Sequence, residues 1–268
     1  MLKGSIVALI TPFKDNSLNE AVYRELIHYH LENGTNGIVP GGTTGESPTL
    51  SHDEHKKLVE VCIEQSNGRV PVIAGAGSNS TAEAVDFVKH ACDAGADGLL
   101  VVTPYYNKPT QSGLLGHYRE LIRHSSKPII IYDIPGRSVI QMSDNTMAEL
   151  AQNDLIVGVK DATGDLNRLD NTIKKLGSEF IQLTGEDGLA FEFNKRGGVG
   201  IISVTANIAP KLCSDFQKFS ISKSDNEQKE AERINNILQP VHNSMFIESN
   251  PSPVKYAAKL LNLCSDDV

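Results

Sequence analysis

Eight short runs of apolar, β-prone residues alternate with helix-period segments along this chain, and this alternation restricts its fold more than any other sequence feature. The segments between the runs carry apolar residues at helical spacing, glycines follow their ends, and Ser51 and Ser80 are suited to N-caps. Nearly continuous apolar strands separated by helices predict a parallel sheet covered on both faces. The runs are SIVALI from Ser5, GIVP from Gly37, VPVIAGA from Val70, GLLVVT from Gly98, PIIIYD from Pro128, IVGVK from Ile156, FIQLTG from Phe180 and GVGIIS from Gly198.

Eight such units in succession predict an α/β fold of the (β/α)8 TIM barrel type, and a length of 268 residues suits one barrel domain. We expect the barrel, with its active site, in residues 1–208 and further helices without a strand between them in residues 209–268. Those C-terminal helices would cap the barrel or supply an oligomer surface. A doubly wound open sheet is the competing architecture, but the GxGxxG turn typical of such sheets is missing.

The composition limits the class of partner. Hydrophobic residues make up 40% of the chain, enough for a full core, and the formal net charge of -8 comes without a Lys/Arg stripe for a polyanion. No apolar run reaches the roughly 18 residues of a membrane span, and the N-terminal run is too short for a secretory signal. We predict a cytoplasmic protein that binds neither nucleic acid nor membrane. Four widely spaced cysteines are expected to be reduced: Cys62, Cys92, Cys213 and Cys264.

Lys160 is a lone basic residue at the end of the run IVGVK, where an active site of a barrel is expected. An amine whose stem lies among apolar neighbours keeps more of the neutral form that attacks a carbonyl, as in a Schiff-base lysine. The alternative is a lysine that extends from the strand end into water. Tyr132 ends the preceding run, and neighbouring strands lie about 4.8 Å apart, so the phenol and the amine could meet.

Other polar loops also follow strand ends, among them GGTTGESP from Gly41, TPYYNKP from Thr103 and TGEDG from Thr184. A plain turn or a phosphate cradle would each explain the glycines of the first loop. The adjacent hydroxyls of Thr43 and Thr44 favour a carboxylate site and a proton relay, and the lysine of a Walker loop is missing.

The sequence predicts no metal site. His52 and His55 are three residues apart but lack a third ligand nearby, so they are interpreted as histidines on a helix surface. The adjacent carboxylates of Glu186 and Asp187 point in different directions and do not suit a glycosidase pair that flanks one bond.

Five motifs in this order, GGTTGES, TPYYNKP, YDIPGR, VKDATGD and GIISVTAN, make the chain resemble the dihydrodipicolinate synthase family of pyruvate-dependent class I aldolases. The resemblance runs from the first strand to the segment NPSPVKYAAK, Asn250 to Lys259. Thr43 and Arg137 are similar to the synthase rather than to N-acetylneuraminate lyase. The resemblance implies a lyase of lysine and diaminopimelate biosynthesis that uses no cofactor and no metal.

The resemblance also implies how the reaction proceeds. Lys160 would form an imine with pyruvate, and the resulting enamine would attack L-aspartate 4-semialdehyde. Tyr132, Thr43 and Tyr106 would form a proton relay, with Tyr106 reaching into a neighbouring subunit of a homotetramer, a dimer of dimers. Substrate-binding residues implied by the same motifs are Thr44 for the pyruvate carboxylate, Arg137 for the semialdehyde carboxylate, and Gly185 and Ile202 for the pyruvate pocket.

A second pocket carries over from family members that L-lysine inhibits, and it predicts an allosteric site for this feedback inhibitor. A glutamate with hydroxyl and imidazole groups suits the ammonium and carboxylate of an amino acid. Pro48 stands where other members often have Ala. The matching residues are Ser47, His52, His55, Asn79, Glu83 and Tyr105.

Three departures from the family pattern accompany the resemblance. Asp133 stands where Asn is more frequent, Glu186 stands where Asp is frequent, and the sequence stops at CSDDV where the family usually continues into a final helix. We expect the last departure to lower stability or weaken a tetramer, because such a helix covers apolar surface. The alternatives are a pyruvate aldolase for a sugar acid, which would not need Arg137, and a barrel that only binds pyruvate or acts as an assembly subunit.

Overall fold

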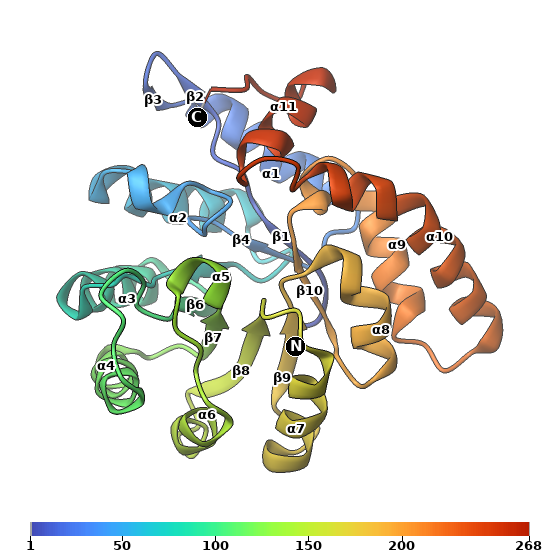
Figure 1. The fold of residues 1–268 in the computed structure, drawn as a ribbon. Helices are drawn as coiled ribbons and strands as arrows, with labels where there is room; N and C mark the ends of the chain where they lie inside the picture. The colour runs from blue at the N-terminus through green and yellow to red at the C-terminus, as the bar shows by residue number, and fades with distance from the viewer. Residues whose placement is uncertain (1, 268) are drawn as a thin grey trace.

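The computed structural model describes residues 2–267, in which eight parallel strands form a barrel surrounded by helices (Figure 1). Hydrogen-bonded neighbours follow the order β4-β1-β10-β9-β8-β7-β6-β5. The two edges meet where Ile38 bridges Val72 in parallel and the Gly75 amide donates to the Pro40 carbonyl at 2.9 Å. The ring is therefore closed, and the predicted (β/α)8 barrel is confirmed. Its strands are β1 (Gly4–Ala8), β4 (Gly37–Val39), β5 (Ile73–Gly75), β6 (Gly98–Val102), β7 (Ile129–Asp133), β8 (Ile156–Asp161), β9 (Ile181–Thr184) and β10 (Gly200–Ser203).

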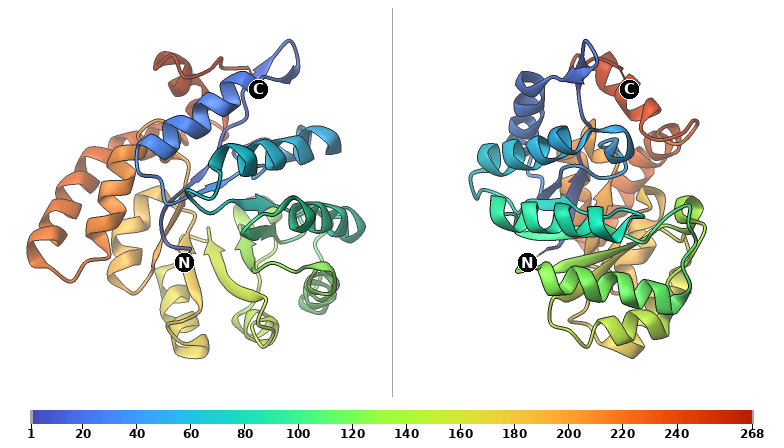
Figure 2. Two further views of the ribbon diagram at one scale, coloured as in Figure 1. Left: turned by 180° about the vertical axis from the view of Figure 1, so that it is seen from behind. Right: turned by 90° about the vertical axis from the view of Figure 1, so that its left-hand side faces the viewer.

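Helices follow every strand and cover the outside of the barrel (Figures 1 and 2). The side chains of Ser51 and Ser80 accept from the amides of Glu54 and Glu83, so both predicted N-caps are confirmed. The helices are α1 (Glu20–Glu32), α2 (His52–Ser66), α3 (Thr81–Ala94), α4 (Gln111–His124), α5 (Pro135–Ser138), α6 (Asp144–Leu150), α7 (Leu166–Leu176), α8 (Ala190–Lys195), α9 (Pro210–Ser220), α10 (Asp225–Ser244) and α11 (Ser252–Leu260), with 3-10 turns η1 (Ser47–Thr49), η2 (Asp187–Leu189) and η3 (Thr205–Asn207).

The C-terminal helices divide into two parts. Helix α9 follows β10, packs on β1 and completes the ring of eight units, whereas α10 packs against α9 from outside. Helix α11 lies beside a small hairpin of β2 (Phe13–Lys14) and β3 (Ser17–Leu18), which the sequence did not predict (Figures 1 and 2). The Ser265 hydroxyl donates to the Phe13 carbonyl at 3.0 Å. The domain boundary at residue 208 stays a prediction.

Side chains of β7 and β8 alternate between the barrel interior and the helix layer. Ile131 packs in the outer core, whereas Ile130 and Tyr132 belong to the interior cluster. A register shift near the start of the pair leaves Tyr132 beside Lys160 at its end. Both side chains therefore lie on the same face of the sheet, at the C-terminal end where barrel active sites form.

Two further predictions concern the chain as a whole. The four cysteines carry free thiols, and two of them, Cys62 and Cys213, are buried. Within residues 2–267 no helix has the length and apolar character needed to cross a bilayer.

Candidate active site

Lys160 lies at the end of β8 with only 6% of its surface exposed. Its Nζ is 4.1 Å from the centroid of the Tyr132 ring. Gly185, after β9, leaves room for the lysine stem, because a Cβ at this position would lie 2.9 Å from Lys160 Cε. The amine is therefore held inside the barrel mouth against an aromatic ring and does not extend into water.

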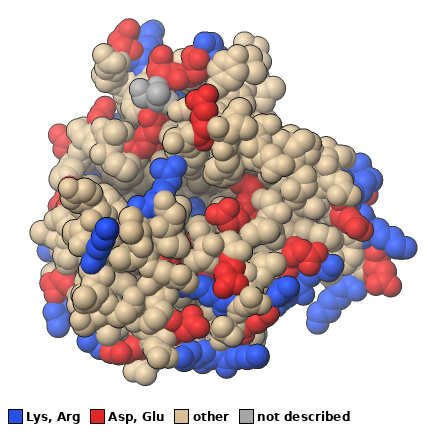
Figure 3. Space-filling model, in the orientation of Figure 1, with Lys and Arg blue, Asp and Glu red and all other residues tan. Residues whose placement is uncertain are grey.

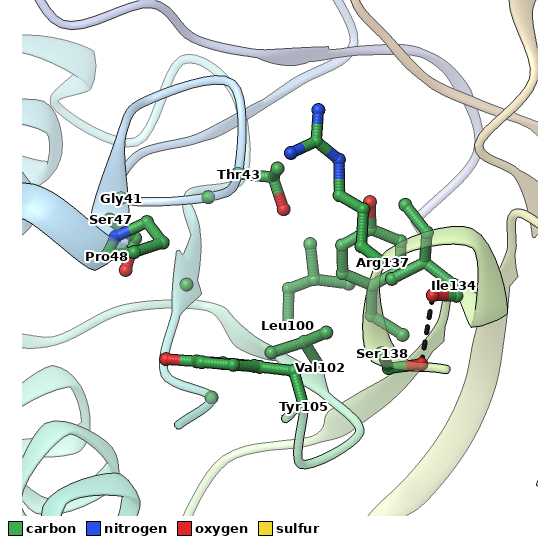
Figure 4. Close-up of a pocket in the computed structure, with 14 residues that line it drawn as sticks. Gly41, Thr43, Ser47, Pro48, Leu100, Val102, Tyr105, Ile134, Arg137 and Ser138 are labelled. Carbon is green, nitrogen blue, oxygen red and sulfur yellow. Dashed lines mark hydrogen bonds between the residues drawn. The ribbon is translucent and has the colours of Figure 1, made fainter. Parts of the chain in front are cut away.

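A cavity of about 260 Å³ opens beside this pair. Thr43, Tyr132 and Arg137 line it, and the Arg137 side chain extends over it toward the loop that carries Thr43 (Figure 4). The face seen in Figure 1 is hollowed near its middle, with basic side chains beside the hollow (Figure 3). Lys160 does not line the cavity itself but contacts Tyr132, which does. Three of the predicted catalytic residues, Thr43, Tyr132 and Lys160, and the predicted substrate-binding residue Arg137 thus lie at or beside one opening.

The loop after β4 is a fixed structure and not a simple connector. A Cβ at Gly45 would approach the Leu9 carbonyl oxygen to 2.9 Å, so the close packing of this loop on the segment that follows β1 requires glycine. The Thr11 hydroxyl donates to the Gly45 carbonyl at 2.7 Å. Glu46 adopts a left-handed conformation with φ of 61° and is buried. Thr43 and Thr44 are therefore presented by a backbone that has little freedom to move.

The C-terminal segment holds this loop in place, a role that the sequence analysis missed. Asn250 Nδ2 donates to Thr44 Oγ1 at 3.0 Å, and Arg137 Nη2 donates to the Asn250 carbonyl at 2.9 Å. The Lys255 ammonium, fully buried, lies 2.6 Å from a carboxylate oxygen of Glu46. The only sequence signal was that both residues fall in the motif NPSPVKYAAK.

The remaining predicted active-site residues lie in different surroundings. Ile202 is fully buried in the interior cluster that also contains Tyr132. Tyr106 is 86% exposed, has a left-handed φ of 69° and does not line the cavity. Within one chain, therefore, the structure brings Lys160, Tyr132 and Thr43 to the mouth of the barrel and leaves Tyr106 outside it.

The two adjacent carboxylates after β9 differ in their surroundings. Asp187 is buried and accepts hydrogen bonds from the Ser203 hydroxyl at 2.5 Å and the Val204 amide at 2.9 Å. Burial raises the pKa of Glu186, and the nearby positive charge of Lys160 opposes this shift. Asp187 therefore serves the loop structure, while Glu186 adds negative potential near the amine.

The six residues of the predicted second pocket lie around the neighbouring loops. Ser47 and Tyr105 line the same cavity as Thr43. The Asn79 carbonyl accepts from Asn107 Nδ2 at 2.9 Å. His52 Nε2 lies 2.6 Å from a carboxylate oxygen of Glu83.

Two residues of this pocket, Glu83 and His55, have shifted pKa values. The hydroxyl of Ser78 and the contact with His52 lower the pKa of Glu83, which keeps the carboxylate charged. His55 stacks on Phe87 with ring centroids 4.2 Å apart, and burial lowers its pKa to about 4, so it is neutral at pH 7. The prediction that both histidines lie on a helix surface is therefore wrong for His55, which packs beneath the loop at Gly41.

A (β/α)8 barrel that holds a lysine against a tyrosine at the C-terminal ends of its strands defines a class, the Schiff-base lyases of class I aldolase type. The model of the Dihydrodipicolinate synthetase family matches residues 1–268, and the chain belongs to this family. The predicted family and lyase class are confirmed.

Named relatives agree over the whole chain. The 4-hydroxy-tetrahydrodipicolinate synthase of Pelagibacter ubique is 64% identical over 268 residues, which are 100% of this chain and 92% of the relative. The crystal structure of the chloride-inhibited dihydrodipicolinate synthase from Acinetobacter baumannii complexed with pyruvate has a TM-score of 0.95 at 44% identity, over 99% of this chain and 90% of that one. A Cyanidioschyzon merolae DHDPS structure with lysine bound has a TM-score of 0.93 at 34% identity, over 97% and 89%.

Proposed function

We propose that this chain condenses pyruvate with L-aspartate 4-semialdehyde, the activity of a 4-hydroxy-tetrahydrodipicolinate synthase, through an imine on Lys160. The observation that carries the proposal is the buried Lys160 amine, 4.1 Å from the Tyr132 ring, at the mouth of a barrel of this family. The protein needs no metal or other cofactor for this chemistry, because the imine itself withdraws electrons.

The reaction divides into steps that the side chains at the mouth can serve. The neutral Lys160 amine adds to the pyruvate ketone, and loss of water gives the imine. The protonated imine acidifies the methyl group, which loses a proton to form an enamine. The enamine carbon bonds to the semialdehyde carbonyl carbon, and the resulting alkoxide takes up a proton. The hydroxyls of Tyr132 and Thr43 would move these protons, since both groups line the cavity.

Two residues would bind the substrate carboxylates. Thr44 Oγ1 accepts a hydrogen bond from Asn250, so its own proton is available to a pyruvate carboxylate. Arg137 uses one nitrogen on the Asn250 carbonyl, and the rest of its planar guanidinium remains for the semialdehyde carboxylate. Gly185 and Ile202 would shape the pyruvate pocket around the lysine. Asn250 would thus lie between Thr44, which would bind pyruvate, and Arg137, which would bind the semialdehyde.

The relay would be completed by a second copy of the chain. Tyr106 is exposed on a loop with an unfavourable left-handed backbone, a conformation that persists where the surroundings require it. We therefore assign Tyr106 to the site of a neighbouring subunit within a homotetramer, a dimer of dimers. A large aromatic side chain that one chain leaves in solvent is well suited to such a contact.

Feedback inhibition by L-lysine is the second part of the proposal. The charged Glu83 carboxylate would bind an ammonium group, and Ser47 and Tyr105 would connect the effector site to the cavity. The family member from Cyanidioschyzon merolae, whose structure has lysine bound, supports this assignment.

Reductive trapping tests the proposed function. Incubation with pyruvate and borohydride should add one reduced pyruvate to the intact chain, and peptide mapping should place it on Lys160. Lys160→Arg should abolish the adduct, whereas Lys174→Arg, an exposed lysine on α7, should not. A folded wild-type protein without an adduct contradicts the lyase proposal. An adduct without consumption of the semialdehyde would favour an aldolase for another aldehyde.

A further inference from the structure

A buried cluster of three charges lies directly behind the Tyr132–Lys160 pair. Asp133 follows Tyr132 in β7, and Asp161 follows Lys160 in β8. The strand register pairs Tyr132 with Lys160 and Asp133 with Asp161. Because consecutive side chains of a strand alternate, the two carboxylates lie on the outer face of the sheet, opposite the site.

Arg168 of α7 joins the two carboxylates. Its side chain is 3% exposed, with Nη2 2.6 Å from Asp133 Oδ2 and Nε 3.2 Å from Asp161 Oδ2. Each carboxylate is also tied to its own loop, since the Met142 amide donates to Asp133 at 3.0 Å and the Thr163 amide donates to Asp161 at 2.8 Å. One guanidinium thus links the ends of two adjacent strands and the loops that leave them.

The cluster is poorly explained as a source of stability. It combines two carboxylates with one cation, and Asp133 Oδ1 and the Nε, Nη1 and Nη2 atoms of Arg168 have no hydrogen-bond partner among residues 2–267, so the guanidinium contacts both carboxylates as an ion pair only. Burial raises the pKa of Asp133 from 3.8 to about 6, although the charge of Arg168 opposes the shift. The folded state therefore binds the Asp133 proton more tightly than the unfolded state, and stability falls as pH rises through this interval. Buried ion clusters of this kind often contribute little net stability.

The cluster is better explained by the geometry of the site. We propose that Arg168 is a positioning residue that acts through Asp133 and Asp161 to hold Tyr132 against the Lys160 amine. This inference rests on the proposed function. Proton transfer and imine formation are sensitive to small displacements, since an error of about 1 Å in placement can cost about 100-fold in rate.

The backbone gives a reason why these two strands need such a tie. The pairing of β7 with β8 contains an irregularity, because Ile129 pairs with Ile156 but Ile130 pairs with Gly158. The strand ends that carry the reacting side chains lie two residues beyond this shift. An ion cluster across the ends fixes their register independently of the irregular pairing.

Arg168→Met tests the proposal, because it removes the charge and keeps most of the stem. We expect the rate of borohydride-trapped imine formation and kcat to fall about 10- to 100-fold. KM for the semialdehyde should change less than about twofold, since Arg137 is not in the cluster. The matched control is Arg196→Met. It breaks an exposed ion pair with Asp170, which lies on α7 like Arg168, and it should leave both rates unchanged.

Asp133→Asn provides a second measurement. Unlike Arg168→Met, it does not leave a buried carboxylate without its cation. It keeps an oxygen for the guanidinium, so kcat should fall only about two- to fivefold. The wild-type kcat profile should bend near pH 6, and the variant profile should not. Three charged or titratable groups face Asp133: Arg168 from α7, Asp161 from β8 and the Tyr118 phenol from α4. Asp161 is the only carboxylate among these three.

The outcomes separate this inference from the proposed function. Wild-type protein that forms no adduct overturns the proposed function and this inference with it. Adduct in the wild type, with wild-type rates in Arg168→Met despite a lower melting temperature, overturns the positioning role alone. If Arg168→Met does not fold, Arg168→Lys keeps the charge but not the planar fork. If Arg168→Lys and Asp133→Asn then showed the wild-type rate of imine formation, the wild-type kcat and the wild-type pH profile, the positioning role of Arg168 would be overturned.

Discussion

The two tyrosines of the proposed relay lie in opposite environments. Tyr132 belongs to a strand, is 5% exposed and contacts the Lys160 amine. Tyr106 belongs to a loop, is 86% exposed and has a left-handed backbone. One chain therefore places Tyr132 against Lys160 by itself, because paired strands fix both residues, whereas in the proposed relay Tyr106 would act in the site of a neighbouring subunit.

The largest expected effect is on the strand side of this comparison. Tyr132→Phe keeps the ring against Lys160 but removes the hydroxyl, and kcat should fall about 100- to 10,000-fold through loss of proton transfer. Steady-state kinetics at saturating substrates measures this change. The control is Tyr23→Phe, which removes the hydroxyl of a buried core tyrosine outside the site and should leave kcat within about twofold. A Tyr132→Phe enzyme with more than a third of the wild-type kcat would contradict the relay.

For Tyr106, on the loop, we expect a smaller loss of kcat, which an intact neighbouring subunit should restore. Tyr106→Phe should lower kcat about 10- to 100-fold, as expected for one member of a proton relay. Mixed with inactive Lys160→Arg subunits, it should regain activity, because a hybrid site combines an intact lysine with an intact Tyr106 from its neighbour. Tyr132→Phe mixed with Lys160→Arg should regain none. Failure of the first mixture to recover, in a proven hybrid oligomer, would place Tyr106 in its own chain's site or outside catalysis.

How far the sequence predicts the site also differs between residues on strands and residues held by long-range contacts. Strand periodicity and the order of the runs place Lys160 and Tyr132 at the barrel mouth, because a period of two residues leaves little choice of face. Glu46 and Lys255 are 209 positions apart, and their pairing depends on how α11 packs, which no local pattern encodes. Arg168 looks like an ordinary polar position of a helix in the sequence, yet it is buried because two strand ends supply its carboxylates.

The loop that presents Thr43 and Thr44 should depend on its buried ion pair for stability. Lys255→Met leaves the Glu46 carboxylate buried without its cation, and the free energy of unfolding should fall by about 3 to 5 kcal/mol. The double variant with Glu46→Gln should recover much of this loss, because neither charge remains. Denaturant unfolding checks both variants. The control Arg119→Met breaks an exposed ion pair with Glu149 and should cost less than about 1 kcal/mol. An equal loss of stability in Lys255→Met and Arg119→Met would contradict a stabilising role for the buried Lys255–Glu46 pair.

The smallest expected effect concerns regulation through the loops rather than catalysis on the strands. Glu83→Gln removes the charge that would bind the ammonium of L-lysine, so the inhibition constant should rise about tenfold while kcat stays within about twofold. Initial rates over a lysine titration measure both values. Glu60→Gln is a matched control, because Glu60 pairs with His90 across the same two helices, α2 and α3, at 2.9 Å, as Glu83 pairs with His52. Equal inhibition of all three proteins would remove Glu83 from the effector site, and a wild-type rate that millimolar lysine leaves unchanged would remove the regulation. Loss of inhibition confined to Glu83→Gln would show that the first turn of α3 carries control, apart from the pair of strand residues, Tyr132 and Lys160, that would carry the chemistry.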